Sequence, residues 1–276
     1  MSSVPDSNGA GRHEPASEPH LLAADSFRVS THAGEPQVRA FSAHLTRFAA
    51  TATAAWLERD CTADPQRIAE ALAAFISEAR ERIAVSGDGF PRLELWSASA
   101  EATSEASAPS LALALRPLPT LGDQVSLVSA PRGVAPMAER KGPNIARYSA
   151  LARDLGGEPL LTDEAGWVLE GATTSVIWWP DRGTAHQGSV VAQAARVPSV
   201  TEATLRAAAT NLSPARVTPD ELRASEVWSV NALHGIRPVT HLDGTPLVSP
   251  NPERLERFRA VLDRSWEPVR ATDGPR

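Results

Sequence analysis

The amino-acid sequence predicts an α/β (α+β) protein with two lobes. The chain has 276 residues, which is enough for two lobes at roughly 100 to 200 residues per domain. Helical and strand patterns alternate along it, and the proline- and glycine-rich stretch APRGVAPMAERKGP interrupts them. We therefore expect a disordered tail at 1–20, an N-terminal lobe at 21–133, a connector at 134–140 and a C-terminal lobe at 141–276.

The composition excludes several classes of protein. The net charge is −6 and the arginines are spread along the chain, so no basic patch for nucleic acid or an anionic membrane is expected. The single cysteine, Cys61, cannot form an internal disulfide, which indicates a reducing compartment, and we expect a cytoplasmic protein. We expect no membrane span and no signal peptide. The seven histidines share no metal-ligand spacing, so we expect no metal site.

The N-terminal half begins with a polar segment that has too few apolar residues to fold. LLAADSFRVS then predicts a strand, and QVRAFSAHLTRFAATATAAWLE predicts a helix. A second helix is expected from Pro65 to Ile83, with Asp64 or Pro65 at its start. FPRLELWSAS and SLALALRPLP indicate an antiparallel pair of strands, and LGDQVSLVS indicates a third.

The C-terminal half begins with a predicted short helix, NIARYSALARDLGG, and three strands within EPLLTDEAGWVLEGATTSVIWWP. Trp178 and Trp179 favour either a strand buried on both faces or an interface. VPSVTEATLRAAATNL predicts a helix with Ser199 as N-cap and Glu202 completing a capping box. A short helix from Thr218, strands in EVWSVNALHGIRPVTHLDGTPLV and an amphipathic helix in PERLERFRAVLDRSW follow.

The basic residues are unusual, because 26 are arginine and Lys141 is the only lysine. Arginine serves equally well as a surface cation, but it keeps its proton and cannot act as an amine nucleophile. A chain that uses arginine nearly everywhere can retain one lysine where an amine is needed. The alternative is codon bias that left one lysine by chance.

Four further residues could carry chemistry, and each also has an ordinary structural explanation. Glu170 lies on a predicted strand, where it either faces solvent or is buried with a cationic partner. Arg47, in HLTRF, is either a surface cation or that kind of partner. Val200 and Thr201 begin a predicted helix, where backbone N–H groups favour an anion.

Taken in chain order, these motifs resemble a known family. HLTRF, KGPN, DEAGWVLEGATTSVIWW, VPSVTEATL and VNALHGIRPV followed by HLDG are similar to the class IV aminotransferases. That family includes branched-chain aminotransferases, D-amino acid aminotransferases and 4-amino-4-deoxychorismate lyases. The resemblance spans about Ala24 to Trp266. It implies a fold-type IV enzyme, with a smaller N-terminal α/β lobe, a larger C-terminal α/β lobe, and pyridoxal 5'-phosphate between them.

The resemblance also implies roles for individual residues. Lys141 resembles the catalytic lysine that forms an imine with the cofactor aldehyde and then moves the substrate proton. Glu170 resembles the carboxylate that pairs with the pyridine nitrogen, and Arg47 resembles the phosphate-binding arginine. The remaining cofactor-binding positions implied by the resemblance are Val200, Thr201, Thr173, Thr174, Asn231 and Ala232.

The sequence departs from the family pattern in four ways. The interval from Lys141 to Glu170 is 29 residues, about one helical turn shorter than usual. Ser199 stands where glycine is usual, and Ala232 lacks a common hydroxyl. Tyr148 lies two residues later than the family's cofactor-binding tyrosine.

Two reactions and one non-catalytic role stay open at this point. The run VNALHGIRPV favours a lyase similar to 4-amino-4-deoxychorismate lyase, which releases pyruvate and 4-aminobenzoate in folate biosynthesis. The alternatives are an aminotransferase acting on branched-chain or D-amino acids, and a family relative that only binds a partner. The substrate is expected to be a small molecule, with His234 and Arg237 as candidates for its carboxylate. The resemblance also implies a homodimer.

Overall fold

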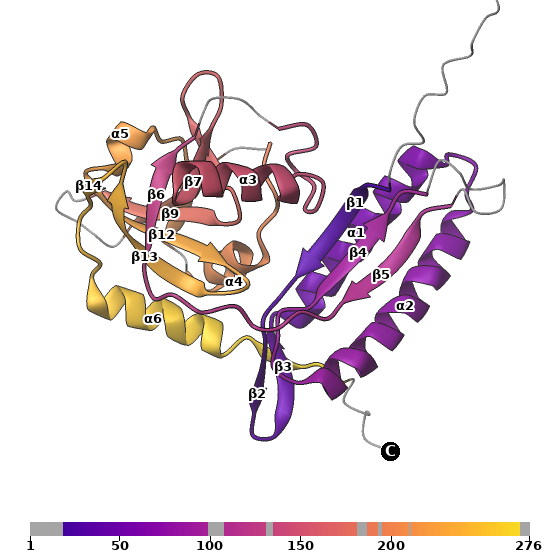
Figure 1. Cartoon of the computed structure of the whole chain (residues 1–276). Helices are drawn as coiled ribbons and strands as arrows, with labels where there is room; N and C mark the ends of the chain where they lie inside the picture. Colours follow the sequence, from indigo (N-terminus) through magenta and orange to yellow (C-terminus); the bar gives the residue numbers. More distant parts are fainter. Residues whose placement is uncertain are drawn as a thin grey trace, which may run out of the picture.

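A computed structural model describes residues 19–98, 108–130, 135–180, 187–192, 195–209 and 211–270. These residues form an N-terminal lobe and a larger C-terminal lobe that lie side by side (Figure 1). The expected tail at 1–20 lies outside the described residues except for its last two positions. Within the described part of the chain, no helix is long and apolar enough to cross a membrane.

The N-terminal lobe consists of an antiparallel three-stranded sheet with two helices packed beside it (Figure 1). Its strands follow the order β1 (Leu21–Ser26), β4 (Arg92–Trp96) and β5 (Ser110–Ala114). Helix α1 (Phe41–Arg59) packs on β1, and α2 (Pro65–Ser86) packs on α1 and β5. The antiparallel pairing of β4 with β5 confirms the expected hairpin.

A second small sheet corrects the expected start of the first helix. The segment that precedes α1 forms strand β3 (Glu35–Arg39), which pairs with β2 (Val29–His32) on one side and β15 (Trp266–Pro268) on the other. Ala40, with φ near 49°, separates strand from helix. The helical spacing begins only at Phe41, and residues 37–39 take strand pairing instead.

The C-terminal lobe is built on a nine-stranded sheet that curls until β8 lies against β9 and β10. The strand order is β11-β10-β9-β12-β13-β6-β7-β8, with β14 paired to β13. The strands are β6 (Val125–Ser129), β7 (Glu158–Thr162), β8 (Val168–Gly171), β9 (Ser175–Pro180), β10 (Gly188–Val191), β11 (Leu212–Ala215), β12 (Ser225–Asn231), β13 (Gly235–Leu242) and β14 (Thr245–Pro246). Strands β10 and β11 were not expected from the sequence.

This sheet has a hydrophobic core on each face. Trp178 packs in one core with residues such as Val176 and Val227, whereas Trp179 packs in the other with Trp228 and helix residues. Alternate residues of a strand point to opposite faces, so neighbouring tryptophans enter different cores. Of the two alternatives for Trp178 and Trp179, the structure supports a strand buried on both faces.

Among the described residues, four helices complete the C-terminal lobe. They are α3 (Ile145–Leu155), α4 (Val200–Ala208), α5 (Pro219–Leu222) and α6 (Pro252–Asp263). Ser199 caps α4 as expected, because its hydroxyl accepts a hydrogen bond from the Glu202 N–H. The Glu202 carboxylate pairs with Arg196 instead of completing a capping box, whereas the short helix α5 has a complete one.

The sheet pairing places two segments in a different lobe from the one expected. Strand β6 was assigned to the lobe 21–133, but it pairs in parallel with β13 and β7 of the large sheet. Strand β15 was assigned to 141–276, but it pairs with β3, and Val269 is buried in the N-terminal core. The chain therefore passes to the second lobe before Val125 and returns to the first at its end.

Candidate functional site

A cavity of about 310 Å³ lies where the two lobes meet. Both lobes contribute to its wall, with side chains from β1, α1, β8, α4 and the loop after β12. Every cofactor-binding position expected from the sequence lines it, namely Arg47, Lys141, Glu170, Thr173, Thr174, Val200, Thr201, Asn231 and Ala232. Residues separated by up to 185 positions in the chain, from Arg47 to Ala232, are brought together here.

Lys141 lies in the turn that leads into α3, and its amine is buried in the cavity wall. Burial lowers the pKa of Lys141 to about 8, and the Arg47 cation acts in the same direction, against the attraction of Asp25 and Glu170. A lysine with a pKa this close to neutrality is uncharged more often than a surface lysine. A larger fraction of the amine is therefore free to act as a nucleophile or to accept a proton near neutral pH.

The backbone beside Lys141 is fixed against β1. The Ala24 N–H donates to the Lys141 carbonyl at 2.8 Å. Gly142 has φ of 127°, and a Cβ there would lie 2.7 Å from the Ala24 nitrogen. Glycine is required at this position by both its conformation and the close approach of the two segments.

Glu170 lies at the end of β8 with only 6% of its surface exposed. Of the two alternatives from the sequence, the solvent-facing one is therefore wrong. Its carboxylate receives a hydrogen bond from the Val197 backbone N–H. None of the ion pairs among the described residues includes it. Burial raises the pKa of Glu170 to about 8, despite the opposing effects of Arg196 and Lys141.

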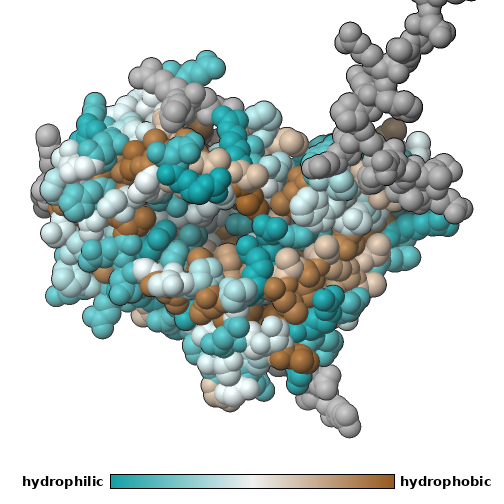
Figure 2. Space-filling view, in the orientation of Figure 1, coloured by the Kyte–Doolittle hydropathy of each residue, from teal (hydrophilic) through white to brown (hydrophobic). Residues whose placement is uncertain are grey.

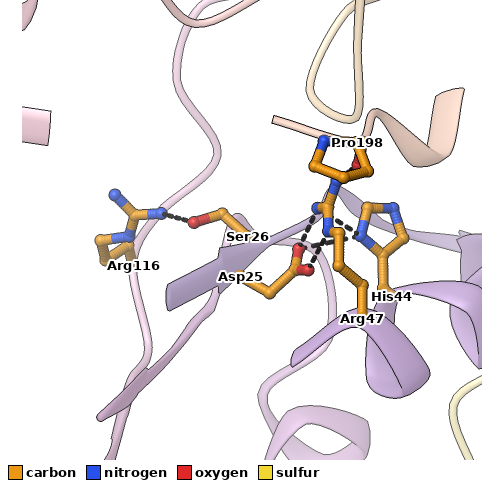
Figure 3. Close-up of polar contacts among 6 residues, drawn as sticks. All are labelled: Asp25, Ser26, His44, Arg47, Arg116 and Pro198. Atoms are coloured by element: carbon orange, nitrogen blue, oxygen red, sulfur yellow. Dashed lines mark hydrogen bonds and ion pairs between the residues drawn. The ribbon is translucent and has the colours of Figure 1, made fainter. Parts of the chain in front are cut away.

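Arg47 is held by a buried cluster that the sequence analysis missed (Figure 3). Its Nε donates to Asp25 Oδ2 and its Nη2 to Asp25 Oδ1, both at 2.7 Å, and its Nη1 donates to the Pro198 carbonyl at 2.7 Å. His44 Nδ1 lies 2.9 Å from Asp25 Oδ1. Arg47 is thus no simple surface cation, since only 14% of its side chain is exposed.

The charges of this cluster follow from burial and pairing. Burial lowers the pKa of His44, although Asp25 acts against it, so the ring is neutral and its Nδ1–H donates to the carboxylate. For Asp25, burial alone would raise the pKa, but Arg47 and His44 together hold it well below its usual range. Asp25 is therefore ionised and Arg47 is its counter-ion.

The first turn of α4 faces the cavity next to Arg47, through Val200 and Thr201. The first N–H groups of a helix have no partner within the helix and carry a partial positive charge. Arg47 contacts Pro198, two residues before the helix. A guanidinium and a helix N-terminus side by side are suited to a phosphate group.

The other expected positions form turns at the edge of the cavity. Asn231 Oδ1 accepts hydrogen bonds from the N–H groups of Leu233 and His234, which fixes the turn after β12. The Ala232 carbonyl accepts from the Arg28 N–H at 3.3 Å, across to the N-terminal lobe. The hydroxyls of Thr173 and Thr174 are directed to the carboxylate of Glu158, another residue that the sequence analysis missed.

Three further arginines line the cavity, namely Arg92, Arg116 and Arg140. Arg92 pairs with Glu94, and Arg140 pairs with Glu58. Arg116 instead donates to the Phe90 carbonyl at 3.1 Å and to Ser26 Oγ, also at 3.1 Å (Figure 3). Burial lowers the pKa of Arg116, with Arg92 adding to the effect, and no ion pair between described residues includes it.

Of the three other candidate residues from the sequence, one lines the cavity and two do not. Tyr148 lines the cavity, and burial together with Glu170 raises its pKa. His234 and Arg237 are not among the residues that line the cavity, so the structure does not bring them to the site as a substrate-carboxylate pair. The only sequence signals for Asp25 and His44 were an acid within an apolar strand and the position of His44 in HLTRF. Arg116 had no such signal.

These groups can act together on one ligand. The cavity is lined by the Lys141 amine, the Glu170 carboxyl group and an anion-binding site formed by Arg47 and the first turn of α4. A planar aldehyde that carries a ring nitrogen and a phosphate would use all three. The donor set therefore fits pyridoxal phosphate.

Several solved structures have a similar fold. A branched-chain aminotransferase from the archaeon Thermoproteus uzoniensis, solved with norvaline, is 17% identical, with a TM-score of 0.70 over 91% of this chain and 90% of that one. A provisionally named 4-amino-4-deoxychorismate lyase from Legionella pneumophila is 17% identical, with a TM-score of 0.67 over 88% and 90%. A hypothetical aminotransferase from Mycobacterium tuberculosis, bound to alpha-ketoglutarate and PMP, is 19% identical, with a TM-score of 0.66 over 96% and 94%.

No curated protein sequence matches the chain. The family model for amino-transferase class IV matches residues 23–242, which include both lobes and the whole cavity wall. With the fold and the buried lysine, this match confirms the resemblance seen in the sequence. The chain belongs to the class IV aminotransferase family, whose members are pyridoxal-phosphate-dependent enzymes.

Proposed function

We propose that this enzyme is a lyase similar to 4-amino-4-deoxychorismate lyases, releasing pyruvate and 4-aminobenzoate for folate biosynthesis. The observation that carries the proposal is Arg116, a half-buried cation on the cavity wall without a carboxylate partner among the described residues. Both products of the reaction are carboxylic acids, so the substrate brings two carboxylates into the cavity. Arg116 is suited to bind one of them through charge-assisted hydrogen bonds.

The proposal assigns the cofactor to the residues expected from the sequence. Lys141 would bond to its aldehyde, Glu170 would accept the N–H of its pyridine ring, and Arg47 would bind its phosphate with the first turn of α4. The absence of an ion-pair partner for Glu170 among the described residues supports its role, because a pyridinium would supply that partner. The remaining contacts are assigned to Thr173, Thr174, Val200, Thr201, Asn231 and Ala232.

The side chains then divide the chemistry among them. When bound, the cofactor withdraws electrons from the carbon that carries the substrate amine. Lys141 Nζ removes the proton from that carbon, and its pKa of about 8 suits a base that works near neutral pH. Glu170 keeps the pyridine nitrogen protonated. Arg116 orients the substrate through its carboxylate.

An aminotransferase is the second candidate, and the same arginine favours it for one class of substrate. A dicarboxylate such as 2-oxoglutarate would also use Arg116. A branched aliphatic side chain would instead pack against the apolar side chains of Phe90, Ile145 and Leu233 in the cavity wall.

We also propose that the enzyme is a cytoplasmic homodimer. Its only cysteine, Cys61, is exposed and free, as is usual for a protein of a reducing compartment. Hydrophobic surface covers part of the N-terminal lobe near β5 (Figure 2), and Leu115, directly after this strand, is 43% exposed. A subunit contact there would bury this apolar surface, and the mass in solution tests this.

The purified protein, saturated with pyridoxal phosphate, should release 4-aminobenzoate from aminodeoxychorismate. Borohydride should trap the cofactor on the peptide that contains Lys141. Lys141→Ala should lower the rate at least about 10²- to 10⁴-fold, the usual contribution of a positioned base, and abolish trapping. Amino transfer from L- or D-amino acids without 4-aminobenzoate release would overturn the lyase in favour of the aminotransferase. Unchanged cellular function of Lys141→Ala would instead indicate a non-catalytic binding protein.

Arg116→Gln tests the carboxylate contact separately. Loss of one hydrogen bond to a charged group costs about 2 kcal/mol, so the KM should rise about 30-fold. Cofactor affinity should stay unchanged. Arg82→Gln, at an exposed position of α2, is the matched control. An unchanged KM for Arg116→Gln would remove this residue from the substrate site.

A further inference from the structure

The cluster of Asp25, His44 and Arg47 contains an acid that the proposed reaction does not use. Asp25 is completely buried and is not among the residues that line the cavity, although Arg47 and His44 are. Its whole contact with the site therefore passes through its two neighbours. Asp25 lies in β1, and the other two residues lie one turn apart in α1.

The hydrogen bonds of Arg47 show what Asp25 does to it. A guanidinium has five N–H groups in one plane. Two donate to Asp25 and one donates to the Pro198 carbonyl. Nη2 also lies 3.4 Å from His44 Nδ1, and the N–H groups that do not donate to Asp25 or Pro198 are the ones left for a ligand in the cavity. Since Asp25 is bound at two points, the plane of the guanidinium is set by the carboxylate.

We propose that Asp25 is a positioning residue that orients Arg47 for the phosphate of the cofactor. The carboxylate fixes the guanidinium at its Nε edge. The remaining N–H groups are thereby directed beside the first turn of α4, which Arg47 reaches through Pro198. His44 holds the carboxylate in turn, through Asp25 Oδ1.

Charge compensation makes this orientation important. Asp25 is ionised, Arg47 is cationic and His44 is neutral, so the cluster has no net charge. A phosphate is then bound by correctly directed N–H groups and less by long-range attraction. The proposal requires that misdirection of a rotating Arg47 costs more phosphate affinity than its uncompensated charge adds.

The cluster also connects the two lobes. Asp25 and Arg47 belong to the N-terminal lobe, whereas Pro198 precedes α4 of the other lobe, 151 positions along the chain. The guanidinium is therefore fixed by one lobe and aimed at the helix of the other. The position of the proposed phosphate site therefore depends on the contacts of Arg47 with both Asp25 and Pro198.

The test compares pyridoxal phosphate with pyridoxal, which lacks the phosphate. Asp25→Asn keeps the size of the side chain but places an amide N–H group against the donors of Arg47 and His44. We expect the Kd for pyridoxal phosphate to rise at least about tenfold, while the Kd for pyridoxal stays within about twofold. Binding is followed by the absorbance of the Lys141 adduct. A merely structural defect would weaken both ligands equally, and that result would overturn the proposal.

Glu94→Gln is the matched control. Glu94 is a buried carboxylate on the neighbouring strand, paired with Arg92. This variant should leave the ratio of the two affinities unchanged. If Asp25→Asn fails to fold, His44→Leu removes only the third donor and should raise the ratio about threefold. An unchanged ratio for His44→Leu would then count against the proposal.

This inference rests on the phosphate position in the proposed function, and Arg47→Gln separates the two. If Arg47→Gln changes the ratio but Asp25→Asn does not, the phosphate lies at Arg47 and Asp25 has no positioning role. If neither changes it, the phosphate position itself is wrong.

Discussion

Asp25 and Glu170 are both buried carboxylates near the place where the two lobes meet, yet their pKa values are shifted in opposite directions. Asp25 is fully buried and Glu170 is 6% exposed. The pKa of Asp25 lies well below its usual range, because Arg47 and His44 donate to it. The pKa of Glu170 is raised to about 8, because burial is opposed by only one backbone N–H and by cations that do not pair with it.

The comparison shows that burial alone does not determine the state of a carboxylate. Both residues lose hydration, but only Asp25 recovers that loss through ion pairs within the described part of the chain. Asp25 thus has its ion-pair partners within the protein and needs no ligand to supply one. Glu170 has no ion-paired cation among the described residues. This is expected of a carboxylate whose cationic partner is supplied by a bound ligand.

The largest difference should appear when each acid is neutralised in the apoprotein. Asp25→Asn leaves the Arg47 charge without its counter-ion, so the free energy of unfolding should fall by about 3 to 5 kcal/mol. Urea unfolding at pH 8 measures it. A loss below about 1 kcal/mol would mean that the buried pair does not hold the fold together.

Glu170→Gln should have the opposite sign. Removing a buried charge without an ion-pair partner should raise the free energy of unfolding of the apoprotein at pH 9 by about 2 kcal/mol. Glu202→Gln is the matched control, because Glu202 is equally buried but pairs with Arg196. That variant should be destabilised. Equal losses in both variants would erase the distinction between paired and unpaired acids.

The dependence on pH gives the smallest change over any single pH unit. Glu170 binds its proton more tightly when folded, so stability should fall as pH rises from 4.5 to about 8, by at most about 1.4 kcal/mol per pH unit. Asp25 adds no slope there, because its contribution is complete above its unfolded pKa of 3.8. His44 and His234, with lowered pKa values, give the opposite slope below pH 6.5.

Subtracting the stability curve of Glu170→Gln from that of the native apoprotein cancels the histidines. The difference should change across this window and become flat above pH 8. A flat difference throughout would show that Glu170 titrates normally.

Most secondary structure followed from the local pattern, and the exceptions share a cause. Helix α2 begins at Pro65 with Asp64 as its cap, as expected, because caps and periodicity are local signals. The segment 37–39 and strands β10, β11 and β15 were not predicted as strands, and β6 was predicted as a strand but assigned to the other lobe. These pairings depend on distant partners, and a sequence pattern does not name the partner of a strand.

The candidate site divides in the same way. The sequence by itself determined the single lysine, the ordered motifs around it and hence the family and cofactor. Only the tertiary structure decided that Glu170 is buried without an ion pair among the described residues, that Asp25 holds Arg47 and that Arg116 faces the cavity. The physical reason is that residue type and spacing select a chemistry, whereas hydration, pairing and pKa depend on contacts between residues far apart in the chain.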